Sequence, residues 1–373
     1  MRIQCRLLPM HYEFWQGDLQ LNQQVYRKLI SSRSTGLAPS LLRMMLRPAS
    51  WIYAGVISLR NLLYSRGKLH AHTAEAVVIS IGNITTGGTG KTPLVIWLCG
   101  LLRKKELACA ILTRGYKLKK NKLSDEPAIL TTSCPEAKVI VNPDRVVGAA
   151  EAVGKFAAKV LVMDDGFQHR RLKRDLDIVT IDAMCPFGYD RLLPGGLLRE
   201  PVTALKRAHA AVITRCDLVD ESQLGAIEKR LSTINPEMII ARAIHTPVCA
   251  KTLGPREMPL QELADKKVFA FCGIGNPDSF LRTIKNLGAN LLGYRIYNDH
   301  HDYTNQCLTD ICEEARYLGV DFILTTQKDW TKTALPVPAK DIPLAYLVIQ
   351  LKFVAGEQEL TSLIENALAG RMT

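Results

Sequence analysis

None of the ten cysteines in this sequence has a neighbour at the Cys-x-x-Cys spacing of a metal or redox site. Several lie inside apolar runs, where a free thiol behaves as a small hydrophobic group, among them Cys99, Cys109 and Cys272. This distribution argues against a disulfide scaffold and favours a protein of the reducing cytoplasm.

Long apolar runs, internal repeats and low-complexity segments are also missing. No uncharged apolar stretch approaches the roughly 20 residues that a membrane span requires. The N-terminus lacks the charged, apolar and cleavage regions of a signal peptide, so we expect none. The chain has 373 residues, of which 47% are hydrophobic, and this is enough for two domains with substantial cores.

Acidic residues are absent from Leu19 to Ala74. Basic residues in that stretch are interleaved with leucine, methionine and tryptophan, which is typical of a helix lying on an anionic membrane. We expect residues 36–68 to form two short helices broken at Pro48, within a membrane-docking segment of residues 36–70. Two alternatives stay open, a helix packed on the protein's own core and a nucleic-acid surface, although no nucleic-acid module is recognisable. Residues 1–35 form a leader of unclear structure.

The most informative segment is an apolar, β-branched run, Val77–Ile81, followed by a loop rich in glycine and threonine. Glycines let backbone N–H groups surround a phosphate, a lysine reaches the terminal phosphates, and a threonine hydroxyl can ligate Mg²⁺. A strict Walker A pattern fails because Thr85 stands at its first glycine position. The alternative is an ordinary turn. We predict a nucleotide triphosphate site formed by Gly87, Gly88, Thr89, Gly90, Lys91 and Thr92.

Strand-like and helix-like segments alternate from Glu75 onward. This alternation predicts an α/β fold, a P-loop NTPase-like parallel sheet with helices on both faces. A second, smaller α/β block begins after a proline-containing stretch, so we expect domains at residues 71–262 and 263–373. The expected strands of the first domain are Val77–Ile81, Cys109–Thr113, Val139–Val141, Val160–Met163, Ile178–Asp182 and Ala211–Thr214.

A second acidic site follows the strand Val160–Met163. Asp164 and Asp165 end this apolar run, which is the Walker B arrangement that holds Mg²⁺ directly or through water. Adjacent carboxylates at a strand end point in opposite directions, so we expect only one of them to be a direct ligand. A charged turn after a core strand is the simpler alternative. Together with Lys91 and Thr92, the pair indicates phosphoryl transfer or nucleotide hydrolysis.

Several motifs, in order, resemble those of the tetraacyldisaccharide 4′-kinases, the lipid A 4′-kinase family. The resemblance runs from about Gly36 nearly to the C-terminus and departs from the family where Gln327 replaces the more usual Glu. The matching segments are Gly82–Pro93, Thr113–Tyr116, Asp164–Arg170, Leu192–Pro201, Asp299–His301 and Thr326–Asp329.

The resemblance implies an ATP- and Mg²⁺-dependent kinase that phosphorylates the 4′-hydroxyl of a tetraacylated glucosamine disaccharide 1-phosphate. It places the enzyme at the cytoplasmic face of the bacterial inner membrane, which accords with the basic segment. No nucleic acid and no obligate protein partner are expected.

The same resemblance assigns residue roles. It implies that Asp125, in a run where Ser124 replaces the family's glycine, is the catalytic base. His300 is its partner, although the adjacent His301 competes for that assignment. Lys91 acts on the transferred phosphate. Arg145, Arg199 and Glu200 match family residues near the bound nucleotide.

A membrane-associated ATPase or GTPase switch is the alternative function. A phosphate loop, a Walker B acid and an amphipathic segment suit both. The pairing of Asp125 with His300, which a switch does not require, favours the kinase.

Overall fold

The computed structural model describes residues 26, 29–31, 36–115, 125–252, 257–298, 301–333 and 342–372, without the side chains of residues 37, 38, 125 and 372. Its strands form one 12-stranded sheet in the order β10-β9-β11-β12-β7-β6-β5-β1-β4-β2-β3, with β8 paired to β7. Neighbouring strands are parallel except at β12–β7 and β7–β8. The strands are β1 (Val77–Gly82), β2 (Cys109–Thr113), β3 (Lys138–Val141), β4 (Val160–Asp164), β5 (Leu176–Asp182), β6 (Ala210–Thr214), β7 (Ile239–Lys251), β8 (Glu257–Met258), β9 (Lys267–Cys272), β10 (Asn290–Ile296), β11 (Phe322–Thr326) and β12 (Leu344–Ala355).

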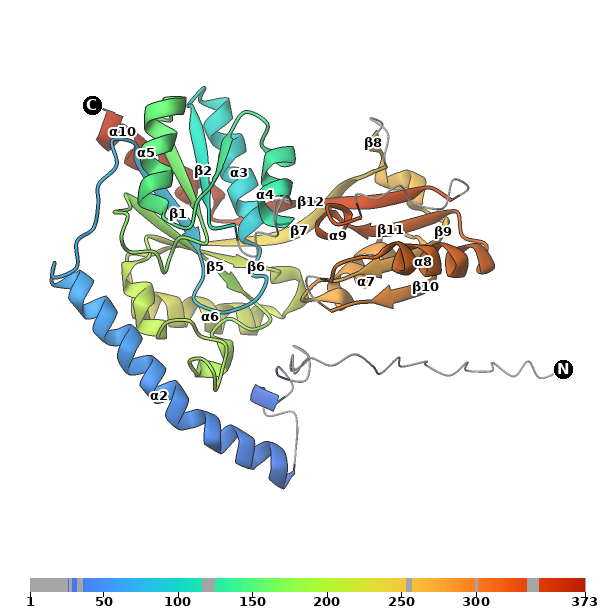
Figure 1. Ribbon diagram of the computed structural model, residues 1–373, viewed down its shortest axis with the longest axis horizontal. Helices are drawn as coiled ribbons and strands as arrows, with labels where there is room; N and C mark the ends of the chain where they lie inside the picture. The colour runs from blue at the N-terminus through green and yellow to red at the C-terminus, as the bar shows by residue number, and fades with distance from the viewer. Residues whose placement is uncertain are drawn as a thin grey trace.

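Helices cover both faces of this sheet (Figure 1). They are α2 (Leu37–Ser65), α3 (Lys91–Lys104), α4 (Asp125–Ser133), α5 (Arg145–Phe156), α6 (Glu221–Ile234), α7 (Pro277–Asn286), α8 (Asn305–Tyr317), α9 (Gln327–Trp330) and α10 (Glu357–Met372). Alternate residues of β1 serve different cores, since Ile79 packs with α3 and α10 while Val78 packs with α5. The predicted α/β class and all six strands of the first domain are therefore confirmed.

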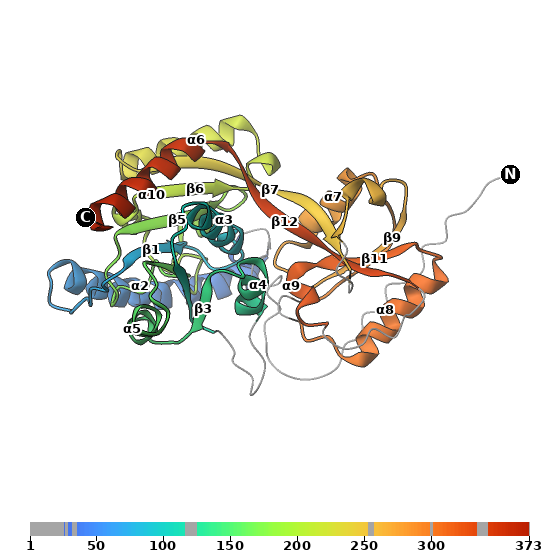
Figure 2. The same cartoon turned by 90° about the horizontal axis from the view of Figure 1, so that it is seen from above.

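Two long strands join the halves of the molecule. β7 and β12 pair with each other and run from the first half into the second (Figure 2). The second half contains β9, β10 and β11. α7 and α8 pack against these strands in two separate hydrophobic cores. α10 then returns to the first half, where Leu360, Ile364 and Leu368 pack with α3. The last helix of the expected block 263–373 thus packs against the core of the first half.

The N-terminal segment forms one helix, α2, of 29 residues, so the expectation of two short helices broken at Pro48 was wrong. Pro48 lies inside this helix and is exposed, so its ring displaces no packed element. The exposed residues of α2 include large apolar side chains, among them Met45, Trp51 and Ile52, which are 74%, 72% and 71% exposed.

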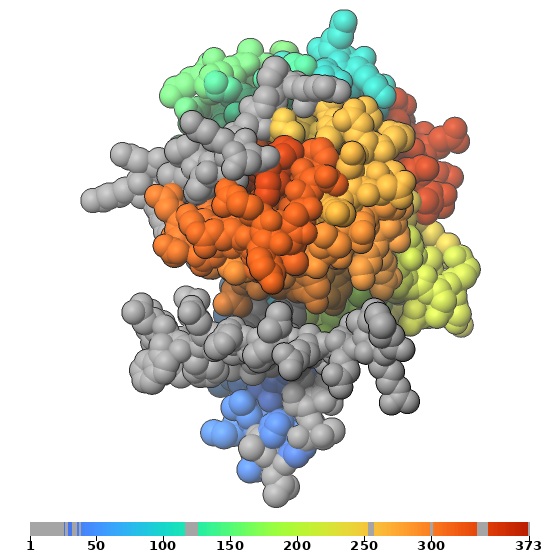
Figure 3. Space-filling view, turned by 90° about the vertical axis from the view of Figure 1, so that its right-hand side faces the viewer, coloured from blue at the N-terminus to red at the C-terminus, as the bar shows by residue number. Residues whose placement is uncertain are grey.

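This helix crosses the lower left of Figure 1 and forms the lower end of the molecule in Figure 3. Within the described part of the chain, no helix has both the length and the hydropathy that a bilayer span would need.

Candidate phosphoryl-transfer site

The phosphate loop lies at the carboxyl end of the sheet, between the end of β1 at Gly82 and the start of α3 at Lys91. Gly90 has φ 84°, and a Cβ atom there would lie 2.7 Å from Nε2 of His245. Burial, reinforced by Arg215, lowers the pKa of His245 to about 4, so the imidazole behind the loop is neutral at pH 7. Gly82 is equally constrained, since its Cβ would lie 2.5 Å from Cβ of Phe167. The loop backbone is therefore held close to the neighbouring strands.

Buried hydroxyl and amide groups brace the loop from inside. The Asn83 side chain donates to Oγ1 of Thr89 at 2.9 Å, and Thr89 shares a 2.7 Å hydrogen bond with the hydroxyl of Thr180 on β5. From β6, Thr214 donates to the carbonyl of Thr89 at 3.0 Å. The Thr89 side chain is thus directed into the protein. The sequence analysis missed Thr180 and Thr214, although a hydroxyl near the carboxyl end of an apolar strand is a visible signal.

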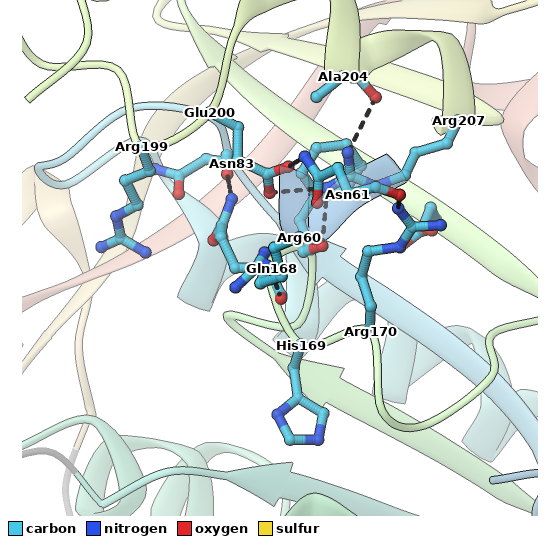
Figure 4. A network of polar contacts seen from close by, with 12 residues as sticks. Arg60, Asn61, Asn83, Gln168, His169, Arg170, Arg199, Glu200, Ala204 and Arg207 are labelled. Atoms are coloured by element: carbon cyan, nitrogen blue, oxygen red, sulfur yellow. Dashed lines mark hydrogen bonds and ion pairs between the residues drawn. The ribbon is translucent and has the colours of Figure 1, made fainter. Parts of the chain in front are cut away.

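Two further segments hold the outer side of the loop. The Gln168 side chain donates to the carbonyl of Asn83 at 2.8 Å (Figure 4), and the backbone N–H of Arg199 donates to the carbonyl of Ile84 at 2.7 Å. Arg215 donates to the carbonyl of Gly88 at 2.7 Å. Each of these three contacts uses a loop carbonyl and no backbone N–H, the kind of donor that an anion requires, although the N–H of Thr86 donates to the carbonyl of Leu197.

We expect Gly90→Ala to lower both the thermal stability and the affinity for ATP. The left-handed φ alone costs a residue with a side chain about 1–3 kcal/mol, and the added methyl group collides with His245. Calorimetry and nucleotide titration would measure the two losses. Gly100→Ala in α3 is the matched control, because its Cβ meets nothing within 4 Å. Unchanged ATP binding by Gly90→Ala would contradict the expected loop geometry.

Asp165 forms ion pairs with two cations beside the loop. Lys91 lies with its Nζ 3.2 Å from Oδ1 of Asp165, and Arg199 approaches Oδ2 to 2.9 Å. Burial alone would raise the pKa of Asp165, but Lys91 and Arg199 outweigh it and lower the pKa to about 2. The structure thus brings together three residues that the sequence placed in separate motifs.

Asp164 and Arg145 lie behind this ion-paired group. Asp164 is the last residue of β4 and is buried, and burial followed by the charge of Glu126 raises its pKa to about 7. Arg145 is buried at the start of α5 and donates to the carbonyls of Asn142 and Asp164, at 3.0 and 3.3 Å. Burial lowers the pKa of Arg145. Asp164 and Asp165 therefore occupy different environments, as the sequence predicted for adjacent residues at a strand end.

The oxygen ligands of a Mg²⁺ site fit this arrangement. A buried carboxylate that is costly to ionise gains from a nearby divalent cation, and Thr92 presents a hydroxyl in the first turn of α3. Magnesium keeps several water and phosphate ligands, so it needs few from the protein. Among the described residues, no group of three or more His, Cys, Asp or Glu could hold a metal ion by itself.

Glu200 faces away from its neighbour Arg199. Its carboxylate is completely buried, accepts from Asn61 of α2 at 2.7 Å and pairs with Arg207 at 2.8 Å (Figure 4). Tyr53 of α2 donates to the carbonyl of Arg199 at 2.9 Å. Of the predicted nucleotide-binding pair, Arg199 therefore forms an ion pair with Asp165, whereas Glu200 accepts a hydrogen bond from α2.

Two predicted catalytic groups, the Asp125 side chain and His300, lie outside the described residues. The backbone of Asp125 begins α4, and Gln327 of α9 donates to Ser133 at the end of α4 at 3.2 Å. His301 stacks on Tyr297 at 4.4 Å between ring centroids, and burial followed by Lys332 lowers its pKa. The second half thus contacts the helix that starts at Asp125.

A buried carboxylate, Asp329, lies near this contact. Asp329 accepts hydrogen bonds from Tyr303 at 3.1 Å and Thr326 at 2.6 Å. Burial, followed by the charge of Asp329, raises the pKa of Tyr303. The Thr-x-x-Asp spacing of Thr326 and Asp329 is a helix-capping signal that was present in the sequence. This arrangement fixes the start of α9, which contacts α4.

The comparisons with known proteins agree on one family. Residues 42–369 match the profile of a family described as tetraacyldisaccharide-1-P 4′-kinase. A tetraacyldisaccharide 4′-kinase of Halothermothrix orenii is 36% identical, with 82% of this chain and 86% of the relative covered. One of Anaeromyxobacter is also 36% identical, with 89% and 92% covered.

A solved structure agrees with these sequence matches. The "apo" form of LpxK from Aquifex aeolicus, in complex with ATP, superposes with a TM-score of 0.70 at 31% identity. The superposition covers 88% of this chain and 99% of the Aquifex aeolicus chain.

Proposed function

This chain belongs to the tetraacyldisaccharide 4′-kinase family, and we propose that it transfers the γ-phosphate of ATP to the 4′-hydroxyl of a tetraacylated glucosamine disaccharide 1-phosphate. The observation that carries the proposal is the convergence of Lys91 and Arg199 on Asp165 beside the phosphate loop. Two cations held by one carboxylate are positioned to move a short distance onto phosphate oxygens when a nucleotide binds.

In this proposal the loop and α3 hold the β- and γ-phosphates of ATP. The loop N–H groups and the positive end of α3 attract phosphate, and the Lys91 side chain exchanges Asp165 for a terminal phosphate oxygen. Arg199 is the second cation able to offset charge on the transferring group. The ATP-bound relative from Aquifex aeolicus supports ATP as the donor.

Mg²⁺ completes the proposed site. Thr92, Asp164 and Asp165 would hold it, and it would neutralise charge on the β- and γ-phosphates. Asp165 already binds two cations, whereas Asp164 is buried with its pKa raised by that burial. Asp164 is therefore the proposed principal carboxylate for the metal.

The acceptor hydroxyl requires a base, and we assign that role to Asp125. A sugar hydroxyl is a weak nucleophile until a carboxylate orients it and accepts its proton. His300 is the proposed partner that holds this carboxylate, and it would come from the second half of the molecule. The contact of Gln327 with Ser133 supports this assignment, since it joins the second half to α4.

The proposed lipid acceptor also explains the exposed apolar face of α2. A tetraacylated lipid stays in the bilayer, so its kinase must work at the membrane surface. Trp51, Ile52 and Val56 form part of an exposed apolar face, and basic residues occur along the same helix. We place the enzyme peripherally on the cytoplasmic face of the bacterial inner membrane, with anionic lipid as its surface partner.

Transfer of labelled phosphate from Mg-ATP to a tetraacylated glucosamine disaccharide 1-phosphate in mixed micelles tests the proposal. A bis-phosphorylated product that depends on both Mg²⁺ and the acceptor is the expected result. Steady ATP hydrolysis with no labelled lipid would overturn the kinase assignment and favour the nucleotide-dependent switch.

Replacement of Trp51 and Ile52 by serine is expected to lower partition onto anionic vesicles by about tenfold or more. Each large apolar side chain contributes about 1.5–3 kcal/mol when fully buried, and both are exposed on α2. The melting temperature in solution should hardly change, because neither side chain is packed in the protein. Vesicle sedimentation measures the effect, and full binding by the double variant would remove α2 as the docking element.

A further inference from the structure

A basic cavity of about 210 Å³ lies at the C-terminal end of α2, away from the phosphate loop. Tyr64 of α2 and Ala71 line it together with Arg170, Lys173, Arg174 and Arg207. Asp177, the second residue of β5, also lines it. The cavity therefore lies near the amino end of β5, whereas the phosphate loop lies at the carboxyl ends of the strands, so it is separate from the transfer site.

The cations of this cavity outnumber the carboxylates that neutralise them. Arg174 pairs with Asp177 at 2.9 Å, and Arg207 pairs with Glu200 at 2.8 Å. The guanidinium of Arg170 instead donates to neutral groups, the carbonyl of Asn61 at 2.9 Å and the hydroxyl of Ser65 at 3.5 Å. Lys173 forms no ion pair with any described residue. Four cations thus meet two carboxylates, which leaves two positive charges without a counterion in the part of the chain that the structure describes.

Two features show that the excess positive charge of the cavity is unfavourable when no anion is bound. Burial, followed by Arg207 and Arg174, lowers the pKa of Arg170, so these like charges repel one another. Nε of Arg207 is buried and has no hydrogen-bond partner among the described residues. An anion in the cavity would offset the repulsion among these cations.

The position of the cavity relative to α2 indicates the source of that anion. The apolar side chains Ile52, Val56 and Leu59 are exposed on the outer face of the helix, whereas Tyr64 on the inner face lines the cavity. An interfacial helix sinks its apolar face about 5–10 Å into the boundary between headgroups and acyl chains. Because a helix is about 10 Å across, its inner face then lies at the depth of the headgroup phosphates.

We propose that this cavity binds the headgroup phosphate of an anionic phospholipid and thereby fixes the C-terminal end of α2 on the bilayer. The proposal rests on the membrane docking of α2 described under the proposed function. Arg170 and Lys173 supply the charge that remains after Arg174 and Arg207 have met their carboxylates. The phosphate contacts would also stabilise the Arg170–Asn61 hydrogen bond, which joins α2 to the segment following β4.

The test fills the cavity without altering charge. Ala71→Met places a neutral side chain in it, and sedimentation compares binding to vesicles of phosphatidylcholine alone and of equal parts phosphatidylcholine and phosphatidylglycerol. We expect Ala71→Met to weaken binding to the anionic vesicles by about fivefold, the contribution of one basic side chain at an anionic surface. Lys173→Gln should cause a similar loss. Lys285→Gln on α7, an exposed lysine of the second half, is the matched control and should bind as wild type does.

The outcomes separate this proposal from the docking of α2. If Ala71→Met binds anionic vesicles as tightly as wild type does, the cavity does not bind a headgroup phosphate. The docking of α2 on the membrane would be unaffected by that result. A wild-type enzyme that binds both vesicle types equally would overturn the anionic surface itself. A raised KM for the lipid substrate in neutral detergent micelles, measured for Ala71→Met, would assign the cavity to the substrate's own phosphate and overturn the phospholipid.

Discussion

Asp125→Asn is expected to lower kcat by about 10²- to 10⁴-fold while leaving the affinity for ATP nearly unchanged. The amide keeps the size of the side chain but cannot accept the proton of the 4′-hydroxyl. ATP binding should survive because the buried groups that brace the loop come from Asn83 beside β1, Thr180 on β5 and Thr214 on β6. Turnover assays combined with nucleotide titration separate the two quantities.

Glu136→Gln is the control for this prediction. Glu136 lies just beyond α4 and is exposed, with the exposed Arg103 as its ion-pair partner. Exposed ion pairs contribute little to stability, so we expect the control to keep its turnover. Equal losses of ATP affinity and kcat in Asp125→Asn would show that this carboxylate supports the nucleotide site and is not the base.

The central sheet could be predicted from the sequence because its strands are buried on both faces. Such strands are continuous apolar, β-branched runs, as in Val77–Gly82 and Val160–Asp164, and these stand out against amphipathic helices. The loop and the Walker B acids follow those strands directly. Their positions at the carboxyl edge are therefore fixed once the sheet is known to be parallel.

α2 and α10 show where local sequence signals fail. Pro48 predicts a break, but an exposed proline can remain inside a long helix whose inner face is held by contacts such as Asn61 with Glu200. α10 follows the second block along the chain, yet β12 carries it back to the first core. Both outcomes depend on contacts between residues more than a hundred positions apart, which no local pattern contains.

The partners of the site residues were equally hidden. The sequence placed Arg199 and Glu200 together, since they are adjacent in one motif. In the structure they diverge, with Arg199 on Asp165 and Glu200 on Asn61. Adjacency in a motif therefore does not imply a shared ligand.

Lys91→Ala is expected to lower kcat/KM by at least about 10²- to 10³-fold, the usual cost of removing one group that stabilises charge in the transition state. Lys91 is the first residue of α3, so its cation and the positive end of the helix act on the same phosphate. Lys104→Ala, at the other end of α3, is the control and should retain full activity. Turnover of Lys91→Ala within a few-fold of wild type would exclude a role for Lys91 on the phosphate.

A double variant that combines Lys91→Ala with Asp165→Asn tests whether Asp165 acts by positioning Lys91. Asp165 pairs with both Lys91 and Arg199, and these cations lower its pKa to about 2 against the opposing effect of burial. If Asp165 acts through Lys91, the losses in Lys91→Ala and Asp165→Asn should add to more than the loss in the double variant. If Asp165 also holds Mg²⁺ independently, the losses should approach additivity. Measuring kcat/KM over the four enzymes separates positioning of the lysine from metal binding.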